Sequence, residues 1–351
     1  MKDVSALANT VGGDLIYGIA TSKGVITDIP GVKVNSADDE MLRLDSLMQA
    51  GIEPSLVGTR MRAVALSNGN HVIVVRVRPS WNPPHRAIYK GTKRFYGRNS
   101  TQAYELTVEQ LRAVFTGAVD AERRITDFRL QRLARLKSKI GPHLTGPGAI
   151  VLHVVPVNAP TVPLDVSGLV TAGQAFAPMA PLGYNNRVNF DGIAFETAGG
   201  EGLEHAAMTQ VFRDGRIEAG RGKMTFRRPD HERVLSYGDA VPNLLQAVER
   251  YVKALHERGV AAPFAIMVSL IDMGGTVMMD HDHWYSGASS ADRDDFLFEL
   301  VILDDVSFGE GWQVSMRPML DQWWNAFGRN RCFHLFDEAG AWKGYPQNWR
   351  V

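Results

Sequence analysis

The chain has 351 residues, 45% of them hydrophobic, and its 38 Lys and Arg residues balance 38 Asp and Glu residues. The length predicts two domains, and the zero net charge argues against indiscriminate electrostatic binding by the whole molecule. With one cysteine, Cys332, no apolar run long enough to span a membrane and no signal-peptide core, the sequence predicts a cytoplasmic protein without an internal disulfide or a Cys-based zinc cluster.

The first predicted elements are a helix end at 3–10, a turn and a strand at 15–19. Gly18, inside the strand, indicates a bulge or the close approach of another backbone. The turn could expose amide groups to a phosphate, although a tight helix-to-strand turn explains it equally well. The candidate phosphate residues are Asn9, Thr10, Gly12 and Gly13.

A helix should begin after Ser36, which is a typical N-cap, and end at Gly51. The next two β-rich runs predict a hairpin around Asn68-Gly69, with strands at 60–66 and 71–77. In the second strand, Ile73, Val75 and Val77 should face one side, and Arg76 and Arg78 the other. A second hairpin follows around Gly91, with strands at 88–90 and 94–96.

Between Glu53 and Glu105 there is no acidic residue, although the segment contains many cations and aromatic or imidazole rings. The cations are Arg60, Arg62, Arg76, Arg78, Arg86, Lys90, Lys93, Arg94 and Arg98, and the rings are Trp81, His85, Tyr89, Phe95 and Tyr96. Cations interleaved with flat rings are typical of a nucleic-acid surface. A strand pair whose outward positions happen to be basic is the alternative.

Several motifs of the first hundred residues resemble the Schlafen AlbA-type putative DNA-binding domain. They are Asn9-Thr10-Val11-Gly12-Gly13 with its flanking helix and strand, Pro79-Ser80, Pro84-His85, and the segment from Phe95 to Thr101. The resemblance implies an α+β domain that binds nucleic acid. The basic segment and the resemblance together give Arg76, Arg78, His85, Arg86, Lys90, Lys93, Arg94, Tyr96 and Arg98 as the candidate binding residues.

Two departures from the nuclease-active Schlafen pattern affect the expected activity. Only Met1-Lys2 precede Asp3, where those proteins carry a glutamate pair, and Ala20 and Thr21 stand where an acidic residue would follow the strand. The resemblance therefore implies binding without the metal-holding carboxylates. It also raises the possibility that Met1 lies inside a longer reading frame.

Thr107 and Gln110 predict a capping box that opens a connecting helix extending through Leu136, with basic later turns. These cations could contact phosphate or lie on a solvated connector, which is the preferred interpretation. Glycine and proline then indicate a linker. The predicted domains are 1–140 and 149–351, with the linker at 141–148.

The second domain should be α+β, because its predicted strands and helices do not alternate regularly. The predicted strands are 150–155, 188–195, 209–212, 216–219, 264–270 and 296–303, and the predicted helices are 239–258 and 319–327. Six of the seven Trp residues lie near the carboxyl end and indicate an aromatic core or an interface, of which the core is the preferred interpretation. The whole organisation resembles a bacterial two-domain family, and this likeness implies no activity.

The loop from Asp280 to His283 is the one concentrated set of metal-ligand residue types, but neighbouring residues on an extended backbone point to opposite faces. We expect a polar loop, with His281 and His283 as weak metal candidates and no cofactor.

The sequence thus predicts a non-catalytic protein that binds DNA or RNA and has a carboxy-terminal sensor or partner module, with regulation as a role it leaves open. Whether the protein forms a homodimer is left open. The alternatives are a Schlafen-like nuclease completed by upstream sequence or a partner, and a metal-dependent hydrolase using Asp280 to His283. On the binding interpretation, replacing Arg94 and Arg98 should weaken binding more than replacing Arg135 and Lys137.

Overall fold

The computed structural model describes residues 1–22, 24–56, 58–89, 91–158, 163–180, 183–197, 203–228, 231–279 and 289–346. They form two compact units, Met1–Arg123 and Arg124–Val351, and helix α3 (Val108–Ser138) passes from one into the other. In the expected linker, strand β10 (His143–Leu144) pairs in parallel with β14 (Glu204–His205). The domain boundary at 141–148 stays a prediction.

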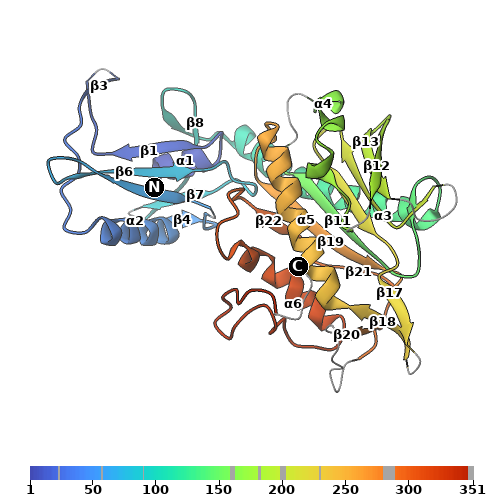
Figure 1. Ribbon diagram of the computed structural model, residues 1–351. Helices are drawn as coiled ribbons and strands as arrows, with labels where there is room; N and C mark the ends of the chain where they lie inside the picture. Colours follow the sequence, from blue (N-terminus) through green and yellow to red (C-terminus); the bar gives the residue numbers. More distant parts are fainter. Residues whose placement is uncertain are drawn as a thin grey trace. The chain divides into compact units, whose positions relative to one another are not determined.

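The first unit is built from short helices and strands (Figure 1). They are α1 (Lys2–Ala8), β1 (Gly13–Tyr17), β2 (Ala20–Ser22), β3 (Val25–Asp28), α2 (Ala37–Gly51), β4 (Ile52–Glu53), β5 (Arg60–Ala65), β6 (His71–Val77), β7 (Arg86–Tyr89), β8 (Thr92–Arg98), β9 (Ala103–Glu105) and the start of α3. The strand order is β1-β6-β5 in one sheet and β4-β7-β8-β9 in another, with β2 and β3 as a separate hairpin.

The first unit has its core on one face of the β1-β6-β5 sheet. Ile73, Val75 and Val77 are buried there against α1 and α2, while Arg76 on the same strand is exposed. This confirms the predicted alternation along β6, which follows from the pleat of a strand. Ser36 accepts a hydrogen bond from the Asp39 amide and caps α2 as expected.

The turn after α1 depends on glycine. Gly12 has a φ of 75°, its amide donates to the Leu7 carbonyl, and a Cβ at this position would lie 2.6 Å from Cδ of Pro79. At Gly18, a Cβ would lie 2.9 Å from Cα of Gly31, which confirms the predicted close approach of another backbone.

The second unit holds one large sheet with helices on both faces. Its elements are the end of α3, β10, β11 (Ala149–Pro156), α4 (Val166–Val170), η1 (Gly173–Phe176), β12 (Tyr184–Asn189), β13 (Gly192–Thr197), β14, β15 (Ala207–Phe212), β16 (Ile217–Arg221), β17 (Thr225–Arg228), β18 (His231–Ser236), α5 (Tyr237–Glu257), β19 (Phe264–Ile271), β20 (Val277–Met279), β21 (Phe296–Leu297), β22 (Val301–Leu303), η2 (Trp312–Met316) and α6 (Arg317–Asn325).

The large sheet has the order β12-β13-β15-β16-β11-β19-β21, with β22 also paired to β19, and all its pairs are antiparallel. Ile150 and Leu152 of β11 join the core with α5 on one face, and Val151 packs with Leu133 and Leu136 of α3 on the other (Figure 1). Strands buried on both faces explain why β11 and β19 read as continuous apolar runs. The fold is α+β, as predicted.

Two predicted strands are each divided in the structure. Residues 188–195 form the end of β12, a turn and part of β13, because the Asn189 side chain accepts from the Gly192 amide and closes the turn. Residues 296–303 form β21 and β22, separated by a segment in which the Phe298 carbonyl accepts from Arg129. In both cases local apolar character predicted a continuous strand, and side-chain hydrogen bonding interrupts it.

The aromatic core predicted near the carboxyl end is confirmed for Trp323 and Trp324, which are fully buried and meet Tyr237 edge-on. Cys332 is buried beside them, and burial raises the pKa of its thiol to about 11. Trp284 and Trp349 lie outside the described residues.

No helix in the described part of the chain combines the length and apolar character needed to cross a membrane.

Candidate nucleic-acid interface

The outward face of the β1-β6-β5 sheet carries a row of arginines. The register pairs Arg60 with Arg76 and Arg62 with Val74, and directly opposed residues in an antiparallel pair share a face. Arg60, Arg62 and Arg76 are all exposed. Because the core covers the other face of this sheet, the outward face presents these cations to the surroundings.

Apolar and acidic side chains share this face with the arginines. Ile16 of β1 lies opposite Val74 and is 49% exposed, and Val64 of β5 is 44% exposed. Asp14 lies opposite Arg76 and accepts two hydrogen bonds from its guanidinium, both 2.8 Å long. These bonds, with the Arg76 charge, hold the pKa of the Asp14 carboxyl below its usual value, although partial burial opposes them.

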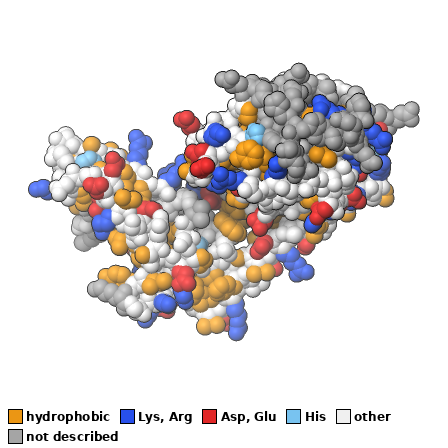
Figure 2. Space-filling model, turned by 90° about the horizontal axis from the view of Figure 1, so that it is seen from below, with side chains coloured by type: hydrophobic (Ala, Val, Ile, Leu, Met, Phe, Trp, Pro, Cys, Tyr) orange, Lys and Arg blue, Asp and Glu red, His pale blue; other side chains and the backbone are white. Residues whose placement is uncertain are grey.

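Several other arginines of the acid-free segment lie beside acidic residues from outside it. Arg86 donates to Glu53 at 2.7 Å, Arg94 donates to Glu105 at 2.7 Å, and Arg98 lies 3.6 Å from Asp3. The hydrogen bonds from Arg86 lower the pKa of the Glu53 carboxyl. On the face of the molecule in Figure 2, blue basic side chains are likewise interspersed with red acidic ones. The fold thus brings acidic residues beside a segment whose own sequence contains none.

His85 lies in the interior, unlike the surface position expected from the sequence. Its ring nitrogens lie 2.6 Å from the Pro54 carbonyl and 2.6 Å from Oγ of Ser80, and its side chain and backbone are only 3% exposed. Burial lowers the pKa of the imidazole, while the hydrogen bond to Pro54 opposes this shift. The ring therefore joins two loops and does not present itself to a ligand.

The Asn9 side chain is used in the same interior network. Its Nδ2 donates to the carbonyls of His85 and Tyr96, and its Oδ1 accepts from the His85 amide at 2.6 Å. The Thr10 hydroxyl donates to the Ala6 carbonyl at 2.8 Å. With Gly12 packed on Pro79, this geometry favours the tight structural turn over a phosphate site.

The aromatic pair on β8 is divided between two faces of its strand. Phe95 meets Phe115 of α3 edge-on, with ring centroids 6.2 Å apart, and Tyr96 lies 5.5 Å beneath the Lys2 ammonium. Both rings are half-buried. Both rings make contacts within the first unit, and the part of Tyr96 in binding stays a prediction.

The first unit therefore combines an interior polar network with an open sheet face that carries arginines. Residues 1–107 match the family model Schlafen, AlbA_2. A search of curated proteins and a search of solved structures found no match for the chain. The Schlafen, AlbA_2 match covers the amino-terminal third and agrees with the resemblance seen in the sequence. This family suggests nucleic-acid binding.

Within the residues that match Schlafen, AlbA_2, the structure singles out Arg60 and Arg62, which the list of candidate binding residues omits. The signal was present in the alternation Arg60-Met61-Arg62, which places both arginines on one side of a strand. Arg78 is half-buried and Lys93 is exposed on β8. Lys90, His281 and His283 lie outside the described residues.

The basic end of α3, which follows the Schlafen, AlbA_2 region, is not a solvated connector. Arg129 is 7% exposed and donates to Ser269, Val268 and Phe298, and Arg132 donates to the buried Glu218. The sequence interpretation was wrong for these two residues, because their partners are remote in sequence.

Among the described residues, no group of three or more His, Cys, Asp or Glu side chains is placed to hold a metal ion.

Proposed function

We propose that this protein is a non-catalytic nucleic-acid-binding protein and that it binds through the outward face of the β1-β6-β5 sheet. The observation that carries the proposal is the in-register, exposed row of Arg60, Arg62 and Arg76 within a region that matches a family associated with nucleic acid. Guanidinium groups bind phosphate through paired, charge-assisted hydrogen bonds, which suits this row to a sugar-phosphate backbone.

The charge of the region supports the same function. Residues 1–107 contain 13 Lys and Arg against 9 Asp and Glu, whereas the whole chain is balanced. Ile16 and Val64 add exposed apolar surface beside the arginines, which suits contact with sugars or base edges. Arg86, Arg94 and Arg98 lie on β7 and β8 of the other sheet, so they are not part of this row.

The first test measures how salt changes the affinity for a mixed-sequence DNA duplex. Each phosphate neutralised should add roughly −0.9 to the slope of log K against log salt for a duplex and roughly −0.7 for a single strand. Titrations with duplex DNA, single-stranded DNA and duplex RNA of the same sequence rank the substrates. Affinity that does not change between low and physiological salt would remove the electrostatic basis of the proposal.

The second test locates the surface with two double variants of equal charge change. Arg60→Ala with Arg62→Ala should weaken binding by about 1–3 kcal/mol and make the salt slope shallower by about 2, because two phosphate contacts are lost. Arg94→Ala with Arg98→Ala is the matched control and should change binding little. Both are titrated at fixed ionic strength after a thermal melt confirms folding.

The outcomes of this comparison are distinct. Equal losses from both double variants would indicate a diffuse charge effect without a defined surface. A loss of affinity confined to the Arg94 and Arg98 variant would mean that the interface lies on β8, as the sequence alone suggested.

We also propose that the second unit is a sensor or partner module and that the protein acts in the cytoplasm.

A further inference from the structure

Phe190 lies at the tip of the hairpin between β12 and β13 and is 95% exposed. Asn189 pairs with Gly192 across the hairpin, so Phe190 and Asp191 are the two residues of its loop. Turn positions favour Gly, Asn, Asp, Ser and Pro, because these residues supply the backbone conformations or hydrogen bonds of a turn. The neighbours of Phe190 fit this preference, and Phe190 itself does not. Local turn chemistry therefore gives no reason for an aromatic residue at this position.

The backbone that carries Phe190 is held from several sides. Besides closing the turn, Asn189 donates from Nδ2 to Gln210 on β15 at 2.7 Å. Arg213 donates from its amide to the Asp191 carbonyl at 3.0 Å and from Nε to the Phe190 carbonyl at 3.1 Å. Single exposed apolar residues are common on protein surfaces, so exposure alone indicates no function. A bare ring on a backbone fixed in this way is a preorganised contact, because little conformational entropy is lost when a partner binds.

Two arginines lie beside this turn. Arg213 is exposed and, among the described residues, has no acidic partner. Arg135 of α3 is also exposed, and its guanidinium lies 4.0 Å from the Asp191 carboxylate. Two guanidinium groups against one carboxylate leave a net positive charge around Phe190, which favours an anionic partner.

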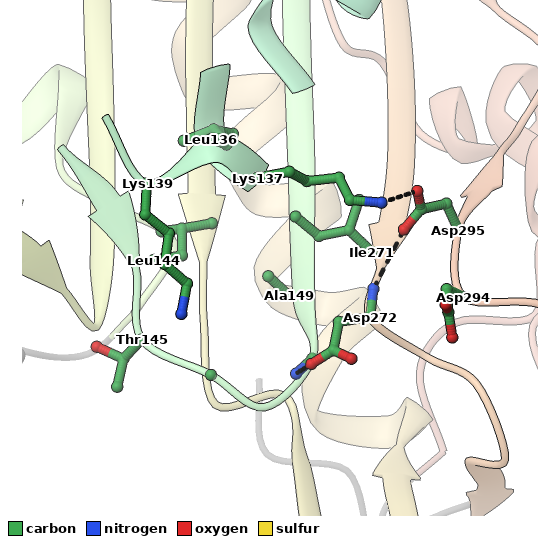
Figure 3. A pocket seen from close by; sticks show the side chains of 12 residues that line it. Leu136, Lys137, Lys139, Leu144, Thr145, Ala149, Ile271, Asp272, Asp294 and Asp295 are labelled. Atoms are coloured by element: carbon green, nitrogen blue, oxygen red, sulfur yellow. Dashed lines mark hydrogen bonds and ion pairs between the residues drawn. The ribbon is translucent and has the colours of Figure 1, made fainter. Parts of the chain in front are cut away.

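The end of α3 adds a further cation, four residues after Arg135. Lys139 is exposed and lines a pocket of about 330 Å³, shown in Figure 3. In that view the Lys137 ammonium donates to Asp295, whereas Lys139 has no hydrogen bond or ion pair among the described residues. Lys139 therefore adds to the positive charge at this end of the helix.

The exposed surface of β12 beside Phe190 has little apolar area. Val188 is exposed, but the other exposed residues of the strand are Asn185, Asn186 and Arg187. Stable protein interfaces bury about 800 Å² on each partner, around an apolar centre. One ring among arginines and asparagines fits nucleic acid better, since a base can stack on the ring while the cations contact phosphates.

We propose that the second unit binds an unpaired base of a nucleic acid by stacking on Phe190, with Arg213 and Arg135 contacting the adjacent phosphates. A base offers its face to a side chain only where it is outside a duplex stack, so the ligand is a single-stranded stretch of DNA or RNA. This contact is additional to the arginine row of the first unit and does not depend on it.

The test is a fluorescence-anisotropy titration of the full-length protein with one labelled single-stranded sequence, made as DNA and as RNA. Phe190→Ala should weaken binding about tenfold because the stacked base is lost, and Phe190→Leu should weaken it nearly as much because leucine has no aromatic face. Phe190→Trp should bind at least as tightly as the wild type. Phe226→Ala is the matched control, since Phe226 is a 44% exposed ring on β17 of another sheet, and should bind as the wild type does.

The arginine contact is tested through the salt dependence of the same titration. Arg213→Ala should make the slope of log K against log salt shallower by about 0.7, because one contact with a single-strand phosphate is lost. Loss of the hydrogen bond to the Phe190 carbonyl alone would weaken binding without changing the slope, and that result would contradict the phosphate contact. Arg293→Ala, which removes an exposed arginine paired with Asp292, is the control.

Equal affinity of the wild type and Phe190→Ala for single strands would overturn the proposal, and full binding by Phe190→Leu would exclude stacking. A fully paired duplex separates this site from the arginine row: Phe190→Ala should leave duplex binding unchanged, whereas Arg60→Ala with Arg62→Ala should weaken it. A wild-type protein that binds duplex but no single strand would overturn this inference and leave the proposed function standing. Because Phe190 is almost fully exposed, its variants should melt as the wild type does.

Discussion

The guanidinium of Arg132 donates two hydrogen bonds to the carboxylate of Glu218, at 3.0 and 2.7 Å, and Glu218 is fully buried. Nε2 of His153, also fully buried, lies 3.2 Å from the same carboxylate. Burial by itself would raise the pKa of Glu218, but the hydrogen bonds from His153 and Arg132 hold it below the usual value. This network joins α3 to β11 and β16.

Glu218→Gln should destabilise the second unit by about 3–5 kcal/mol, because it leaves the largely buried Arg132 guanidinium without an opposite charge. The measurement is urea unfolding followed by tryptophan fluorescence, which reports on Trp323 and Trp324. Glu249→Gln is the control, since the pair between Glu249 and Lys253 is much more exposed and should be worth under about 1 kcal/mol. Equal losses in the two variants would mean that burial of the Glu218 pair does not matter.

Gly192→Ala should destabilise the protein by more than about 1 kcal/mol, because a φ of 153° is strained for alanine and the new Cβ would lie 2.1 Å from the Val211 carbonyl oxygen. Gly117→Ala is the opposite case. Gly117 lies inside α3 with nothing within 4 Å of a new Cβ, so alanine should stabilise the helix by about 0.4–1 kcal/mol. Thermal unfolding of both variants checks the sign, and a stable Gly192→Ala protein would contradict the close contact.

The first unit should lose stability in mild acid because of His85. Burial lowers the pKa of His85, so the folded state binds fewer protons than the unfolded state. The stabilisation is fully present above the unfolded pKa, about 6.5, and is lost as the pH falls through the lower pKa of the folded state.

Hydrogen exchange of peptides covering α1 and β7 should therefore show easier opening as the pH falls below about 6.5, after correction for the intrinsic rate. His85→Gln should show weaker protection near neutral pH and a smaller dependence on pH. His256→Gln, on the exposed last turn of α5, is the control and should behave as the wild type. A wild-type profile that is flat through this range would exclude His85 as the titrating group.

The sequence by itself determined the elements whose signals are local. Thr107 and Gln110 exchange the hydrogen bonds of a capping box, at 3.0 and 3.2 Å, where the residue types predict one. The side-chain alternation along β6 and the hairpin at Asn68-Gly69 are likewise confirmed. These features follow from neighbouring residues and the fixed periods of helices and strands, so no distant contact is needed to predict them.

Only the tertiary structure decided what the charged and imidazole side chains do. Arg132 and Glu218 are separated by 86 residues, and the residues that meet the His85 backbone and ring come from α1 and two loops. A basic run in the sequence specifies charge, but strand pairing brings Asp14 to Arg76 and Glu105 to Arg94. Whether a cation faces solvent or a buried carboxylate depends on chain segments that a local pattern does not contain, because electrostatic partners are chosen by proximity in space.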